Sequence, residues 1–228
     1  MSATPPSADL RARVLAAASA EPVPPRTVGA RRRTMALVAG FTVPVAVSLY
    51  LGWPGPGGRP VAYVATLAVA WLAVGMAATW GGVSRGRSML GRSAAVRLVV
   101  ATLTPVALLA TSLVAALAWP ETLHDDATMG SHLVCVVFTL LCALGPLVAF
   151  AVVRRGSDPV APRLTGAAIG AASGAWGALA IELHCGHASP SHIVLGHLLP
   201  VVVLTVVGVL IGDGVVAVDG RSERSHPR

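Results

Sequence analysis

The chain has 228 residues, of which 54% are hydrophobic and only 12% are charged, and its formal net charge is +7. A soluble domain of this size carries roughly 25% charged residues, so this chain cannot cover a globule with polar surface and is expected to lie in a lipid bilayer. The positive charge does not indicate nucleic-acid binding, because the arginines stand at the ends of apolar runs without alternating aromatic residues.

Residues 1–34 form a polar lead that is too short to be a domain, and too long to be the basic start of a cleavable signal peptide. Ser7 or Asp9 could cap a short helix in SADLRARVLAAASA, in which Leu10, Val14 and Ala18 share one face. Such a tethered amphipathic peptide could dock a partner; the alternative is a disordered lead with a frayed helix at the membrane surface. The candidate partner-binding residues are Leu10, Arg11, Arg13, Val14 and Leu15.

Six apolar runs follow, each close to the ~20 residues that a helix needs to cross a hydrocarbon core of ~30 Å. We expect a transmembrane domain over residues 35–214, followed by a polar tail over residues 215–228. The predicted spans are 35–52, 61–80, 98–118, 132–153, 164–183 and 193–212. The expected fold is therefore all-α: a polytopic membrane bundle of six transmembrane helices.

The arginines are divided unevenly between the two sides of this predicted bundle. All 17 except Arg59 fall in the lead, the second and fourth connections or the tail. Because arginine-rich connections stay in the cytoplasm, both termini are predicted to be cytoplasmic. The connections 53–60, 119–131 and 184–192 then face outward.

Histidines gather at the last two outward connections. All seven except His226 lie in or beside them. The segments LHDDATMGSHLV (123–134) and LHCGHASPSHIV (183–194) align without a gap, which favours a duplicated helical hairpin over chance convergence of short loops. The candidate sensing residues at this outer face are Cys185, His184, His187, His192, His124, Asp125 and His132.

The second of these loops places three metal-binding side chains within four residues. His184, Cys185 and His187 are the candidate metal ligands, because imidazole together with thiolate suits zinc or copper. Glu121 and Glu182 could orient the imidazoles. The alternative is that histidine merely suits a boundary between helix and water, since no zinc-finger or HExxH spacing is present.

The three cysteines differ in their predicted surroundings. Cys185 is expected to be exposed outside, where oxidation can persist and neighbouring histidines could stabilise its thiolate. Cys135 and Cys142 fall inside the fourth predicted span and are interpreted as small hydrophobic residues. A bridge between Cys185 and Cys135 would require Cα atoms within about 7 Å.

The pattern of polar residues also limits the class of function. The middles of the six runs lack the ionisable groups that an ion-coupled transporter needs. No acid/base pair or activated nucleophile presents itself within a span, so no enzyme is expected. A sensor or scaffold remains, and the alternative is a six-helix carrier for a metal or a small solute.

Three elements of the C-terminal half carry a family resemblance. They are the basic turn Arg154-Arg155-Gly156, the ridge formed by Gly166, Gly170 and Gly174, and the element Leu183-His184-Cys185. Over residues 147–214 this pattern resembles the NrsF-like family of six-helix bacterial membrane proteins, negative regulators of extracytoplasmic-function sigma factors. The first three predicted helices match that family only in number and placement.

The resemblance implies an anti-sigma factor of the bacterial inner membrane. Its cytoplasmic lead would sequester an extracytoplasmic-function sigma factor and release it on an exterior metal- or oxidant-type signal. Membrane lipid is the other implied partner, a homo-oligomer is compatible with this class, and direct nucleic-acid binding is not expected. Family members are thought to sense through one cysteine in each of the last two outer loops. Cys185 matches one such position, whereas the equivalent position of the other loop is Asp125. A two-cysteine disulfide switch is therefore the weaker expectation; either His124 and Asp125 serve as ligands instead, or another signal is sensed.

Overall fold

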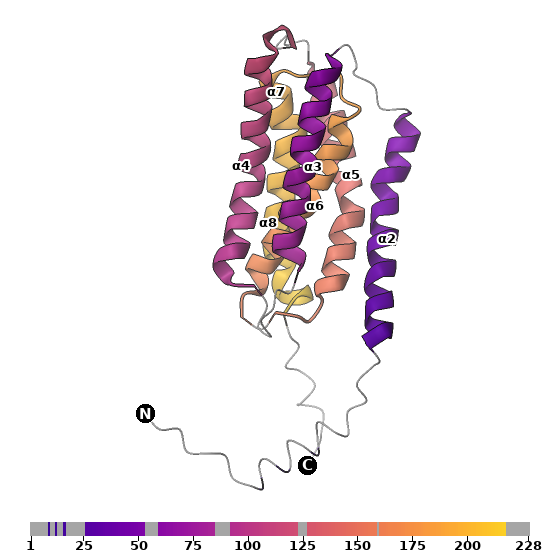
Figure 1. The fold of residues 1–228 in the computed structure, drawn as a ribbon, viewed down its shortest axis with the longest axis vertical. Coiled ribbons are helices and arrows are strands. Elements are labelled where there is room, and N and C mark those ends of the chain that lie inside the picture. Colours follow the sequence, from indigo (N-terminus) through magenta and orange to yellow (C-terminus); the bar gives the residue numbers. More distant parts are fainter. Residues whose placement is uncertain are drawn as a thin grey trace.

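The computed structural model describes residues 26–52, 59–84, 92–122, 127–158 and 160–217, together with the isolated positions 9, 12 and 16. Within these ranges all regular structure is helical, and six helices are long and apolar enough to cross a membrane. The expected all-α bundle of six membrane-compatible helices is thus confirmed (Figure 1). The candidate partner-binding residues Leu10, Arg11, Arg13, Val14 and Leu15, and the loop residues His124 and Asp125, lie outside the described residues.

The elements follow one another as nearly antiparallel rods joined by short connections. They are α2 (Arg26–Leu51), α3 (Val61–Val83), α4 (Ala94–Ala118), η1 (Pro120–Thr122), α5 (Met129–Arg154), α6 (Pro162–Glu182), α7 (Pro190–His192), η2 (Ile193–Leu198) and α8 (Leu199–Val215). The last three form one continuous rod from Pro190 to Val215. We call the end of the bundle near α7 the α7 end; α2 begins and α8 ends at the opposite end (Figure 1).

Helix α6 is the centre of the bundle. In its membrane-length window 83% of the residues are buried, because glycine and alanine on every face let the other helices approach closely. A Cβ atom added at Gly166 or Gly170 would overlap the backbone of α8, at Gly208 and Leu204. The glycine ridge seen in the sequence is therefore the contact surface between α6 and α8.

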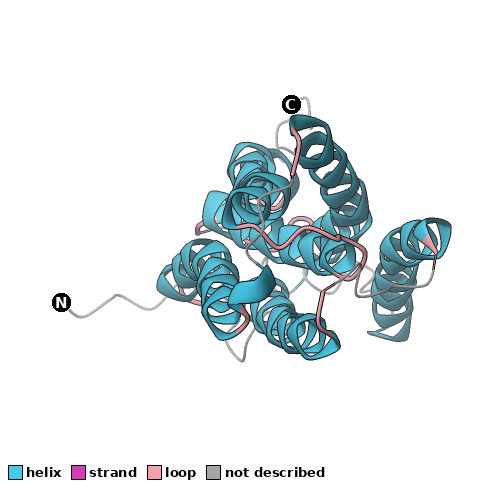
Figure 2. Ribbon diagram, turned by 90° about the horizontal axis from the view of Figure 1, so that it is seen from above, coloured by secondary structure: helices cyan, strands magenta, loops and turns pink. Residues whose placement is uncertain are grey.

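Helix α2 is the most peripheral of the six rods. Only 11% of its window is buried, and Figure 2 shows it at the edge of the bundle when viewed end-on. Its firm contact is with α5, where the backbones of Gly40 and Gly145 meet too closely for a Cβ atom on either residue. Toward the α7 end, an apolar cleft of about 400 Å³ separates α2 from α6, between Phe41, Leu49 and Trp176. Helix α2 also packs through Phe41, whose ring lies against those of Phe150 and Trp176, and through Val47, which packs against the buried residues around Cys135.

A buried ion pair holds the opposite end together. Arg97 of α4 donates to Asp158, which also accepts bonds from the Thr165 hydroxyl and from two backbone N–H groups that follow it. Burial by itself raises the pKa of Asp158, but these hydrogen bonds and the arginine charge outweigh it and lower that pKa below its ordinary value. The backbone N–H of Asp158 in turn donates to the carbonyl of Val216, 3.1 Å away, which ties the end of α8 to this turn.

Two arginines that the sequence placed among the basic connections are in fact internal. Arg97 is 2% exposed and Arg154 is 1% exposed. Both lie on the turns of α4 and α5 that face the bundle, so they contribute to packing at this end instead of forming a basic surface loop.

Candidate metal centre

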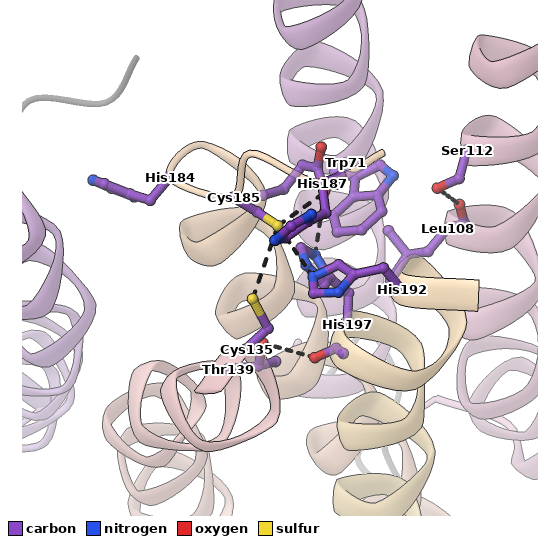
Figure 3. A network of polar contacts seen from close by, with 12 residues as sticks. Trp71, Leu108, Ser112, Cys135, Thr139, His184, Cys185, His187, His192 and His197 are labelled. Atoms are coloured by element: carbon purple, nitrogen blue, oxygen red, sulfur yellow. Dashed lines mark hydrogen bonds and ion pairs between the residues drawn. The ribbon is translucent and has the colours of Figure 1, made fainter. Parts of the chain in front are cut away.

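Four side chains from three separate parts of the chain converge near the α7 end. Their ligand atoms all lie within 4.8 Å of one another, and all four residues are buried. Figure 3 shows them pointing toward a common centre. We call this group the Cys–His cluster; it consists of Cys135, Cys185, His192 and His197.

The turn after α6 carries the first sulfur into the cluster. α6 ends at Glu182, and the backbone N–H groups of His184 and Cys185 both donate to the carbonyl of Ile181 at 2.9 Å. This tight turn directs the Cys185 side chain inward. Its Sγ lies 3.8 Å from the Sγ of Cys135 on α5 and 3.2 Å from Nε2 of His192.

A change of helical pitch supplies both histidines. His192 and His197 are five residues apart, a spacing that an ordinary α-helix would separate by about 140° around its axis. The π-helical segment η2 covers Ile193–Leu198. Because a π turn pairs residues five apart, it brings both imidazoles onto one side of the rod, with ring centroids 5.4 Å apart.

Gly196 is the point at which the π turn meets α5. A Cβ atom there would lie 3.1 Å from Cβ of Cys135 and 3.3 Å from Nε2 of His192, which is tighter than ordinary contact. The Thr139 hydroxyl of α5 donates to the Gly196 carbonyl at 3.4 Å. The absence of a side chain thus lets the two rods close around the cluster.

A buried carboxylate and an arginine support the cluster from behind. The Arg59 guanidinium donates to Oε1 of Glu182 at 2.5 Å and to the Glu182 carbonyl at 2.8 Å. The other carboxylate oxygen, Oε2, lies 3.2 Å from Nδ1 of His197. The expectation that Glu182 orients an imidazole agrees with this arrangement, whereas Glu121 is exposed in η1. Arg59, which the sequence marked only as the one outward arginine, lies inside the bundle.

A family model described as negative regulator of sigma F (NrsF) matches residues 16–217. The chain belongs to the NrsF family. The match takes in all six long helices and every member of the Cys–His cluster, well beyond residues 147–214 that carried the resemblance in the sequence. No curated protein and no solved structure matches the chain. The family is one of regulators and not of enzymes, so the buried sulfur and imidazole groups are best understood as parts of a regulatory protein.

Two expectations about the cysteines of this NrsF-family chain need correction. Cys185 was expected to be exposed, but it is 5% exposed, because the turn after α6 folds it beneath residues 187–192. Cys135 was interpreted as a small hydrophobic residue; it does pack among buried apolar side chains, but the interpretation is incomplete because its sulfur also faces that of Cys185. A second thiol is therefore available from α5, although the loop before it contains no cysteine in the aligned position. Cys142, deeper in α5, is buried outside the cluster.

The ligand set suggested by sequence spacing also differs from the one in space. His184 points away from the cluster (Figure 3): its Nδ1 lies 2.9 Å from the Ala180 carbonyl and its Nε2 lies 3.2 Å from the Gly52 carbonyl at the end of α2. His187 and His132 lie next to the cluster, with ring centroids 4.9 and 5.0 Å from that of His192. Of the candidate sensing residues that the structure describes, Cys185 and His192 are in the cluster itself.

Burial affects both the thiol and the imidazoles at the cluster. The hydrogen bond with Cys135 and burial raise the pKa of the Cys185 thiol, although the two cluster histidines oppose this shift. Among the described atoms, Nδ1 of His192, Nε2 of His197 and both ring nitrogens of His132 are buried without a hydrogen-bond partner. A buried polar atom in this condition costs about 1–3 kcal/mol. A cation held by the cluster would give Nε2 of His197 a partner.

Proposed function

We propose that this chain is a membrane anti-sigma factor that holds an extracytoplasmic-function sigma factor at the bacterial inner membrane. It releases the sigma factor when a metal or oxidant acts on the Cys–His cluster. Membership of the NrsF family supports negative regulation of a sigma factor, and the six apolar helices support a multi-pass membrane position. The observation that carries the signalling part of the proposal is the buried cluster of two sulfurs and two imidazoles at one end of the bundle.

The proposed orientation of the protein in the membrane follows from the distribution of the arginines. With arginine-rich connections in the cytoplasm, both termini are cytoplasmic and the α7 end faces the exterior. The sensing cluster and the sigma-binding lead then lie on opposite sides of the membrane. Residues 1–34, with Leu10, Val14 and Leu15 on the amphipathic segment, are the proposed contact with the sigma factor.

Helix α2 is the proposed link between the two sides. It begins at Arg26, within the C-terminal part of the lead, and it ends at Leu51, next to Gly52, whose carbonyl contacts His184 beside the cluster cysteine. Because α2 is the least buried of the six long helices and an apolar cleft lies between its upper part and α6, a shift of the turn that carries Cys185 can move the upper part of α2. A rearranged α2 would in turn reposition the lead.

The carrier alternative has less support from the structure. The charged side chains of the described residues gather toward the two ends of the bundle, as in the pairs Arg59–Glu182 and Arg97–Asp158. A transporter of ions places its binding groups near the middle of the membrane. The described part of this bundle has an apolar middle instead.

Co-purification with a sigma factor tests the proposal. Full-length protein, a variant lacking residues 2–20, and a control variant lacking residues 218–228 are co-expressed with extracytoplasmic-function sigma factors of the same genome. We expect the full-length and control proteins to retain one of these sigma factors in detergent extracts, and the N-terminal deletion to lose it while still inserting into the membrane. Capture of the sigma factor by the N-terminal deletion variant would contradict the proposal that the lead binds the sigma factor.

A further inference from the structure

Two distances within the Cys–His cluster are close to those of one coordination geometry. Around a tetrahedral zinc ion, with bonds of about 2.3 Å to sulfur and about 2.0–2.1 Å to nitrogen, two sulfurs lie about 3.8 Å apart and sulfur and nitrogen about 3.5 Å apart. The two cysteine sulfurs are 3.8 Å apart, and the Cys185 sulfur is 3.2 Å from Nε2 of His192. All ligand atoms fall within 4.8 Å of one another. Because the tetrahedral separations are shorter than this limit, side-chain shifts of about 1 Å would complete the tetrahedron.

We propose that the cluster is a four-ligand centre for one thiophilic divalent cation of the zinc or cadmium class, bound by Cys135, Cys185, His192 and His197. This rests on the proposed function and names the chemical class of its signal. It replaces the ligand set His184, Cys185 and His187, because His184 turns toward α2. The two histidines, which only the π turn brings together, distinguish this centre from a simple pair of thiols.

The residues behind the cluster have the arrangement that a metal-bound imidazole requires. A histidine that binds a metal through one nitrogen generally donates its other N–H to a carboxylate or carbonyl, which fixes its tautomer and orientation. Nδ1 of His197 faces Glu182, and its Nε2 has no hydrogen-bond partner in the described structure. Arg59 holds the same carboxylate with two further contacts. Glu182 and Arg59 are therefore positioning residues of this centre.

Charge balance selects a divalent ion. Binding releases the protons of the two thiols, and the two resulting thiolates neutralise a 2+ ion. Arg59 and Glu182 already neutralise each other, with side chains 3% and 1% exposed. A monovalent ion would leave one net negative charge in a buried site, where uncompensated charge is costly. Soft thiolate and borderline imidazole ligands in a tetrahedron are also typical of zinc among biological divalent ions.

The competing chemistry at this site is a disulfide. Its formation would join the two sulfurs at about 2.05 Å, with two protons and two electrons passing to an external oxidant. The described cysteines are all free, and the sulfurs at 3.8 Å are well beyond bonding distance. A disulfide would also leave both imidazoles without a ligand. The geometry therefore favours coordination of a cation.

Titration of the purified full-length protein with cobalt(II), zinc(II) and cadmium(II) tests the proposal. The protein is reduced, freed of metal and kept in detergent micelles without any sigma factor. We expect one ion per chain and, for cobalt, the intense visible bands of a tetrahedral site together with thiolate charge-transfer bands. Zinc should displace cobalt. X-ray absorption of the zinc form should count two sulfur and two nitrogen neighbours.

Matched variants assign the ligands. Cys135→Ser should lower zinc affinity by more than about 100-fold and remove part of the charge-transfer intensity, whereas Cys142→Ser, a buried cysteine of the same helix, should leave both unchanged. Helicity and gel filtration identify any variant that fails to fold, and His197→Gln, a second ligand variant, then supplies the test. An octahedral cobalt spectrum, equal affinity in Cys135→Ser and Cys142→Ser, or a Cys135–Cys185 disulfide that forms in place of metal binding would overturn the proposal. Because no sigma factor is present, these results leave the proposed anti-sigma function to its own experiment.

Discussion

Glu182 is the residue for which the structure predicts the largest effect of a single small change. Its carboxylate is fully buried and faces Arg59 on one side and His197 on the other. Replacing it by glutamine keeps the size of the side chain but removes its charge. The guanidinium of Arg59 then stays buried and loses the charge of the carboxylate that faces it.

The magnitude follows from the burial of both partners. Removing one member of a buried ion pair costs about 3–5 kcal/mol. Because glutamine still offers an oxygen, and because the main-chain carbonyl at position 182 keeps its bond from Arg59, we expect the lower end of this range, about 3 kcal/mol. For a chain of this length, about 2–4 °C per kcal/mol corresponds to a fall of about 6–12 °C in the unfolding temperature. Loss of the orienting contact to His197 should also weaken zinc binding about 10–100-fold.

Thermal unfolding of the apo protein in micelles, followed by tryptophan fluorescence, measures the first effect, and competition with a zinc chelator measures the second. Glu121→Gln is the matched control, since this carboxylate is exposed at the same end of the bundle. Arg59→Gln and the double variant complete a thermodynamic cycle. We expect the double variant to be less destabilised than the sum of the single variants, by about 0.5–3 kcal/mol. The reasoning would be refuted if the single variants unfolded at the same temperature as the control variant and if the loss of stability in the double variant equalled the sum of the two single losses.

Three further predictions concern other parts of the bundle. Gly170→Ala places a Cβ atom against the backbone of α8 and should lower the free energy of unfolding by about 1–3 kcal/mol, while Gly214→Ala, in open space on α8, should not; denaturation of both variants in micelles decides this. Asp158→Asn should be less stable than the parent at neutral pH, because the pKa of Asp158 is lowered in the folded protein. The ionised carboxylate therefore stabilises the fold at any pH above the ordinary pKa of about 3.9, and this stabilisation is lost as the pH falls through the lowered pKa. A difference in unfolding temperature between the two proteins that persists unchanged to low pH would contradict this. His184→Ala removes the contact to the Gly52 carbonyl, which is worth about 1 kcal/mol, and should speed amide hydrogen exchange at the end of α2 about fivefold. An unchanged exchange rate there would contradict the proposed link between the cluster and α2.

The length and number of the helices follow from the sequence because they depend on local properties. Each apolar run must satisfy its backbone hydrogen bonds internally in lipid, so hydropathy alone predicts six membrane-length helices, and the described residues form six such helices. The sequence also indicates the close helix contact made by α6, since glycines four residues apart, such as Gly166 and Gly170, leave a groove that the backbone of another helix can fill.

The composition of the cluster depends instead on contacts between distant parts of the chain. Cys135 and Cys185 are separated by 50 positions, and nothing in the local pattern states that α5 lies beside the turn after α6. A span that tolerates cysteine as a small hydrophobic residue has the same sequence pattern as one that presents it to a ligand. Comparison of the two loops alone therefore pointed to Asp125 in place of Cys135.

The sequence by itself determined that this protein is a bundle of six apolar helices, and it predicted all histidines except His226 at one end and all arginines except Arg59 at the other, because burial in lipid and helix periodicity act over a few turns. Only the tertiary structure decided which of those residues act together. The π turn sets His192 beside His197, contrary to the spacing of an α-helix, and helix packing buries Arg59 against Glu182. The hydropathy of the individual runs encodes neither the pitch of the helix after His192 nor the order of the helices around α6 on which the contact between Arg59 and Glu182 depends.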